Sequence, residues 1–220
     1  IGKDYEKPEF GIHSIQIDGN TYPVIEREMQ RKPFCRLLRF KRYADDADNI
    51  AELKDDPPVL VVAPLSGHHS TLLRDTVKTL LRDHKVYITD WIDAKLVPVS
   101  EGQFDLDDYI DYVMEFLEHV AAQGGTHGVH AMAVCQPSVP VFAATAILNM
   151  HESPAAPRTL TMMGGPIDTR EAPTAVIGVR LRALAGSMRR VEGSLLEKFF
   201  FFFEMESRSV ARMECSGTIS

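Results

Sequence analysis

Cys135 is the residue whose surroundings most clearly suggest chemistry. It follows the short apolar run of residues 129–134, and an alanine-rich helical pattern follows it over residues 142–148. Small residues stand two positions before and after it, Ala133 and Pro137. Strand, sharp turn, nucleophile and helix in this order form a nucleophile elbow, whose tight bend requires small residues at those positions. The pattern predicts a nucleophile at Cys135; the alternative is an inert, small hydrophobic residue at the end of a strand.

A thiol in this position needs donors for the oxyanion that forms when it attacks a carbonyl. The helix after the turn would direct its positive end at the sulfur and favour the reactive thiolate. The backbone N–H of Gln136 would be one donor, and the loop of Ser66, Gly67 and His68 would supply a second. Gly67 permits a backbone conformation that aims an amide at a ligand. The alternative for this loop is an ordinary strand-to-helix turn, with Ser70 as the helix cap.

A general base for Cys135 is harder to find. A thiolate mechanism needs a histidine oriented by a carboxylate, and in α/β-hydrolases both follow the nucleophile along the chain. His151 is the only histidine after Cys135, but at 1.5 Å per helical residue it lies roughly 20 Å away. Asp168 stands where some hydrolases keep the acid, although a solvated loop carboxylate also explains it. We therefore expect the acid and the histidine in a C-terminal segment that this chain lacks.

The segments that must position these residues alternate between strand and helix. The continuous apolar run at residues 57–64 is typical of a strand buried on both faces. Residues 85–91 indicate a second buried strand, the run before Cys135 a third strand, and residues 157–163 a further one. Helical spacing of apolar residues separates them over residues 70–81 and 105–123. The alternation predicts an α/β fold, with a mostly parallel sheet and helices on both faces. We expect this fold to be α/β-hydrolase-like and incomplete at the C-terminus.

Functional groups in such a sheet gather at the carboxyl ends of the strands. The segments that fall at this edge are residues 66–68, 90–93, 135–136 and 165–168.

The two ends of the chain differ from this core. Residues 10–29 indicate a hairpin around Asp18-Gly19-Asn20, residues 31–43 a strand with one solvent-exposed face, and residues 44–56 an acidic surface loop. We expect a partial hydrolase domain over residues 1–176, with hairpin strands in 10–43 and βαβ units in 57–168. Residues 177–220 form an atypical tail that contains five consecutive phenylalanines, 199–203, and has no place in this sheet.

Composition narrows the class of protein. The 220 residues are 45% hydrophobic and 25% charged, an ordinary balance for one domain. The net charge of −7 gives no support for nucleic-acid binding. The sequence has no apolar run long enough to span a bilayer and no secretory signal at its start. Three widely spaced cysteines form neither a disulfide framework nor a CxxC metal pattern, which favours a reducing compartment, and we expect no metal or cofactor.

Several stretches resemble one family, the intracellular polyhydroxyalkanoate depolymerases, cytoplasmic bacterial enzymes that act on stored poly(3-hydroxybutyrate). The elbow Ala133-Val134-Cys135-Gln136-Pro137 fits this family, whose nucleophile is a cysteine. The similarity extends over residues 5–176 and is carried by residues 31–38, 62–74, 86–91 and 163–170.

The resemblance implies hydrolysis of polyester at storage granules. The Cys135 thiolate would attack an ester carbonyl, the Gln136 amide and the 66–68 loop would hold the oxyanion, and a 3-hydroxybutyryl thioester would form and be released. Trp91 would line an apolar channel for the polymer, unless it belongs to the core. Two alternatives remain: a polyhydroxyalkanoate synthase-like acyltransferase, which also places a cysteine on such an elbow, and a non-catalytic, degenerate hydrolase fold.

Overall fold

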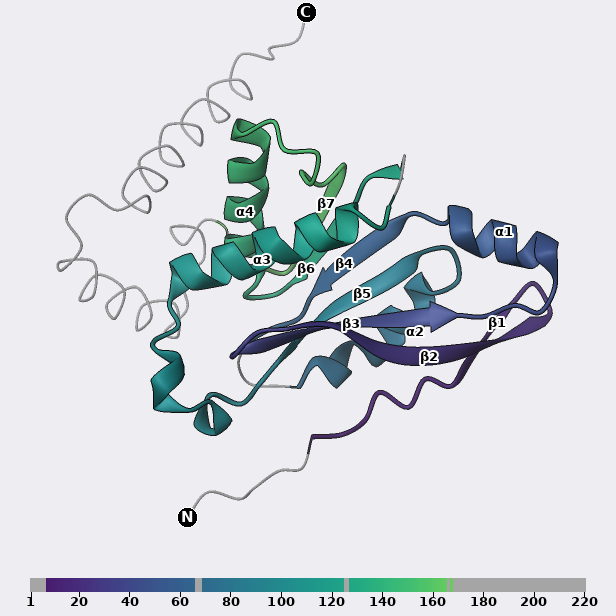
Figure 1. Ribbon diagram of the computed structural model, residues 1–220, viewed down its shortest axis with the longest axis horizontal. Coiled ribbons are helices and arrows are strands. Elements are labelled where there is room, and N and C mark those ends of the chain that lie inside the picture. The colour runs from purple at the N-terminus through teal and green to yellow at the C-terminus, as the bar shows by residue number, and fades with distance from the viewer. Residues whose placement is uncertain (1–6, 66–68, 125–126, 166, 168–220) are drawn as a thin grey trace, which may run out of the picture. The chain divides into compact units, whose positions relative to one another are not determined.

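The computed structural model describes residues 7–65, 69–124, 127–165 and 167, and these form one sheet with helices packed against it (Figure 1). The strands are β1 (Ser14–Ile17), β2 (Asn20–Arg31), β3 (Cys35–Arg42), β4 (Pro58–Val62), β5 (Lys85–Trp91), β6 (His130–Val134) and β7 (Thr159–Met163). The α-helices are α1 (Ala47–Asp55), α2 (Arg74–Leu80), α3 (Leu106–Ala121) and α4 (Ser138–Met150). Short 3-10 helices are η1 (Ser70–Leu73), η2 (Ala94–Leu96) and η3 (Val99–Glu101). The predicted tail, 177–220, lies outside the described residues.

The sheet has the strand order β1-β2-β3-β5-β4-β6-β7. Strands β5, β4, β6 and β7 run parallel to one another, whereas β1, β2, β3 and β5 pair antiparallel in succession. All five residues of the central strand β4 are buried, as its unbroken apolar run predicts. The predicted α/β class, with a sheet that is parallel across its core, is confirmed.

Helices cover both faces of this sheet. Val59 and Val61 of β4 pack in one core cluster with Val77 of α2 and Leu81. Side chains alternate across a strand, so Leu60 points to the opposite face, where α3 packs against β4 and α4 packs against α3. Figure 1 shows α3 and α4 in front of the sheet and α2 behind it.

The N-terminal hairpin has a turn that its sequence favours. Asp18 and Gly19 connect β1 to β2, and both have positive φ, 47° and 85°. Two consecutive residues with positive φ make a type I′ turn, which Asp-Gly favours and which matches the twist of the flanking strands. The hairpin is therefore confirmed, although β2 is much longer than β1.

Two local predictions were wrong. Residues 47–55 form helix α1 rather than an acidic loop, because Asp46 caps it by accepting a hydrogen bond from the Asn49 amide at 2.8 Å. Ser70 does not cap a helix, because its hydroxyl donates to Asp90 instead. Strand β3 keeps part of the expected pattern, because its apolar residues are buried whereas Arg36, Arg39 and Lys41 are partly exposed.

Candidate functional site

Cys135 lies in a sharp turn between β6 and α4, at the carboxyl edge of the parallel strands. Its φ is +69°, a left-handed conformation that costs a non-glycine residue about 1–3 kcal/mol and is concentrated at functional sites. Its side chain is exposed, in contrast to the fully buried Cys35. Strained backbone, exposed sulfur and a following helix are the features of a nucleophile elbow.

Two backbone hydrogen bonds fix this turn. The Cys135 amide donates to the Met163 carbonyl at 2.7 Å, which extends the β6–β7 pairing by one residue. The Ser138 amide donates to the Cys135 carbonyl at 3.1 Å. Pro137 precedes the first helical residue with φ −59° and ψ −15°, so it is already in the helical region and leads directly into α4. The strain at Cys135 is thus held by its neighbours.

The glycines after β7 explain part of the block that carries the family resemblance. A Cβ on Gly165 would lie 2.1 Å from the Ser138 Oγ and 2.8 Å from the Cys135 carbonyl oxygen, so only glycine fits against the back of the turn. Gly164 has φ +62°, which also favours glycine. The chain after β7 therefore supports the Cys135 turn directly.

Gln136 contributes more than the backbone amide that its sequence position predicts. Within the described ranges, no hydrogen-bond acceptor is found for that amide. Its side chain Oε1 also accepts a weak hydrogen bond from the Leu65 amide at 3.4 Å. Sequence reasoning missed this side-chain role, because the contact joins residues 71 positions apart. This hydrogen bond connects the Cys135 turn to Leu65, the last described residue before the 66–68 loop.

Ser66, Gly67 and His68, the predicted second oxyanion element, lie outside the described residues. The residues on either side of this loop are both anchored. Leu65 is held by Gln136, and on the other side the buried Ser70 hydroxyl donates to Asp90 Oδ1. The predicted acid position, Asp168, also lies outside the described ranges.

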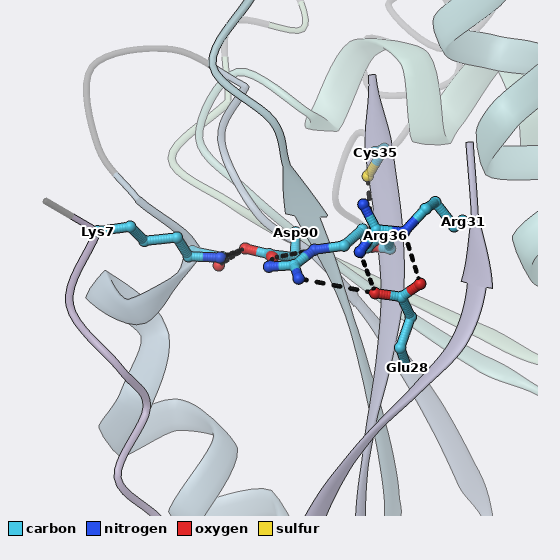
Figure 2. A network of polar contacts seen from close by, with 7 residues as sticks. Lys7, Glu28, Arg31, Cys35, Arg36 and Asp90 are labelled. Atoms are coloured by element: carbon cyan, nitrogen blue, oxygen red, sulfur yellow. Dashed lines mark hydrogen bonds and ion pairs between the residues drawn. The ribbon is translucent and has the colours of Figure 1, made fainter. Parts of the chain in front are cut away.

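Asp90 is the centre of a buried ionic network at the same edge of the sheet (Figure 2). Only 1% of its side chain is exposed, and it accepts from Lys7, from Ser70 and from both Nε and Nη2 of Arg36, the Nε contact measuring 3.0 Å. Burial alone raises the pKa of Asp90, but the hydrogen bonds and charges of Lys7, Ser70 and Arg36 outweigh it and lower that pKa below its ordinary value. The network holds a charge inside the fold.

The network extends outward from Arg36. Glu28 lies 3.6 Å from the Arg36 Nη1 and pairs with Arg31 at 2.7 Å. The sequence predicted that Asp90 lies at the carboxyl edge of the sheet, but it did not predict the ionic network around it. The available signal was a carboxylate inside an apolar strand, together with an arginine on a basic strand that could pair with it; the register does place Arg36 opposite Asp90.

Trp91 is half-buried among aromatic rings. Its Nε1 donates to the Ala63 carbonyl at 2.9 Å, and its ring lies 4.5 Å from that of Tyr109 and 5.7 Å from that of Phe104. The contacts fix Trp91 beside the end of β4. A role in lining a substrate channel stays a prediction.

His151 lies at the C-terminal end of α4, at the other end of the helix from Cys135. No group of histidine, cysteine, aspartate or glutamate side chains within the described ranges has the arrangement of a metal site. None of the described helices is long and apolar enough to cross a membrane.

Fold and turn together define an α/β protein with nucleophile-elbow geometry. Neither a scan of protein-family models nor a search of curated proteins finds a match. Among solved structures, the chain is similar to a serine-to-alanine mutant of LAE6, an α/β hydrolase enzyme from the metagenome of Lake Arreo, Spain, with 11% identity and a TM-score of 0.47 over 78% of this chain and 49% of that one. It is also similar to an esterase of the fungus Rhizomucor miehei, with 12% identity and a TM-score of 0.45 over 72% of this chain and 48% of that one. The chain thus spans about half the length of these structures.

Proposed function

We propose that this chain is part of a carboxylic ester hydrolase in which Cys135 is the nucleophile, and that its substrate is stored polyhydroxyalkanoate, poly(3-hydroxybutyrate) in particular. The observation that carries the proposal is the exposed cysteine with φ +69° directly before the 13-residue helix α4. The polyester substrate and the granule location rest on the sequence resemblance.

The surroundings of Cys135 fit the first half of an acyl transfer. The N-terminal end of α4 lies three residues after Cys135. The thiolate sulfur attacks the ester carbonyl carbon, and the Gln136 amide can donate to the oxyanion that develops. Collapse of this intermediate leaves a thioester on Cys135 and expels the alcohol end of the polymer, which takes up the proton that the base received from the Cys135 thiol.

The second half uses the same base again. Water attacks the thioester, and the base takes its proton as the 3-hydroxyalkanoate leaves. The proposal assigns the histidine and its carboxylate to residues outside the described ranges, so it concerns the longer protein. The esterase among the solved structures is consistent with ester chemistry.

A direct test measures release of 3-hydroxybutyrate from amorphous polymer granules by the longer protein. Cys135→Ala should abolish release while the protein remains folded, and Cys135→Ser should retain only a small part, since a hydroxyl is a weaker nucleophile. Polymer growth from a coenzyme A thioester without any release would instead indicate the synthase-like alternative. Full release by the alanine variant, or absence of both activities in the wild type, would contradict the proposal and favour a non-catalytic fold.

A further inference from the structure

A cavity lies away from Cys135, between α1 and the sheet. Its volume is about 460 Å³, within the range of small-molecule sites. It is lined by residues from the end of β3, from α1 and from Lys85, the first residue of β5. Because β5 and β6 both run parallel to β4, the start of β5 and the Cys135 turn lie at opposite edges of the sheet. The cavity is therefore separate from the candidate site.

Positive charge dominates the wall of this cavity. Five of the lining residues are cationic: Arg39, Lys41, Arg42, Lys54 and Lys85. No aspartate or glutamate is among the described residues that line it. The nearest compensating contact is from Asp56, which accepts from Arg42. Such an imbalance favours an anion.

Arg42 has unused donor capacity inside the fold. Its side chain is only 3% exposed, and its Nη2 donates to Asp56 and, at 2.9 Å, to the His84 carbonyl. Its Nη1 is buried and has no acceptor in the described part of the chain, and the same is true of the Arg39 Nε. Buried guanidinium donors are normally satisfied, and these two belong to residues that line the cavity, although the two atoms themselves are covered by the fold.

The pKa of Lys85 also indicates positive charge around the cavity. Burial lowers its pKa, and the charges of Arg39 and Arg42 lower it further, against the opposing effect of Asp55 and Asp56. A bound anion would relieve this repulsion.

The rest of the lining is suited to a carbon skeleton. Ala44, Ile50 and Leu53 contribute apolar surface to the same cavity. A ligand that matches both parts has a small apolar body and a strongly charged anionic group. Arginine pairs bind phosphate through parallel N–H donors, and a phosphate monoester carries close to two negative charges at neutral pH.

We propose that this cavity is a binding site for a small organic phosphate, with the cationic side chains that line it contacting the phosphate oxygens and the apolar wall contacting the organic group. The site is independent of ester hydrolysis at Cys135, so either assignment can fail without the other.

Calorimetric titration of the 220-residue chain with phenyl phosphate tests the proposed phosphate site. Inorganic phosphate and phenol, titrated separately, represent the anionic and the apolar part of this probe. We expect phenyl phosphate to bind at least tenfold more tightly than inorganic phosphate, and phenol not to bind. Arg42→Gln should weaken phenyl phosphate binding tenfold or more. Arg82→Gln, which removes an exposed arginine elsewhere, should leave it unchanged.

Arg42 also holds Asp56, so its variant is checked for folding by circular dichroism. The double variant Lys41→Gln with Lys54→Gln keeps that pair and should weaken binding severalfold in a folded chain. The proposal is overturned if phenyl phosphate does not bind, if phenol binds equally well, or if the double variant and Arg82→Gln have the same effect.

Discussion

At the scale of single residues, the buried carboxylate of Asp90 depends on its partners for charge compensation. It is buried with 1% of its side chain exposed, and its charge is balanced by Lys7 and Arg36, whose side chains are 30% and 29% exposed. Removing one partner of a buried ion pair commonly costs 3–5 kcal/mol, because it leaves a charge uncompensated. The partial exposure of both cations reduces that cost, and we expect Asp90→Asn to lower the free energy of unfolding by about 2–3 kcal/mol.

Urea unfolding at neutral pH measures this effect, with Asp111→Asn, an exposed carboxylate of α3, as the matched control. The control should change stability by less than about 0.5 kcal/mol. Equal effects of the two substitutions would show that the network does not stabilise the fold.

The same residue sets a pH dependence. The pKa of Asp90 is lower in the folded chain than in the unfolded one, so its contribution is fully present above the unfolded pKa, about 3.9, and is lost as the pH falls through the folded value. The stability difference between wild type and Asp90→Asn should therefore shrink below about pH 4. A difference that grows with acidification would contradict the assignment.

At the scale of elements, the Cys135 turn depends on the chain that leaves β7. A methyl group at residue 165 would overlap Ser138, and forcing extra atoms into a packed site typically costs 1–3 kcal/mol. We expect Gly165→Ala to destabilise the chain by about 2 kcal/mol and to slow hydrolysis by the longer protein.

Gly164→Ala is the control for this prediction. Its Cβ would meet nothing within 4 Å, so it adds only the strain of its positive φ, about 1 kcal/mol. Ser138→Gly should recover part of the stability lost in Gly165→Ala, because it removes the overlapping atoms. Absence of that recovery would show that the two residues do not press on each other.

At the scale of the whole molecule, the sequence predicted the features that depend on the local pattern of residues. The strand runs, the Asp18-Gly19 turn and the bend at Cys135 each follow from neighbouring residues, and the structure contains them. The prediction that Ser70 caps a helix failed because a tertiary partner, Asp90, accepts from its hydroxyl. Asp90 takes the Ser70 hydroxyl from 20 positions away and Arg36 from 54.

Helix α1 was missed for a different reason. It is short, and its acidic composition resembles a surface loop, so only the Asp46 cap and the half-buried Ile50 and Leu53 distinguish it. The cationic cavity that α1 helps to form could not be predicted either, because it depends on how α1 packs beside β3 and β5.

The most direct test of the central claim, that Cys135 is a nucleophile in an exposed turn, is site-resolved acylation of the chain itself. The Cys215→Ala variant is treated with an activated butyrate ester, and mass spectrometry follows thioester formation at Cys135 and Cys35. Cys35 is fully buried, and burial raises the pKa of its thiol well above the ordinary value, so it should stay unmodified while Cys135 is acylated rapidly. Acylation of Cys135 that is no faster than that of Cys35 would contradict the account.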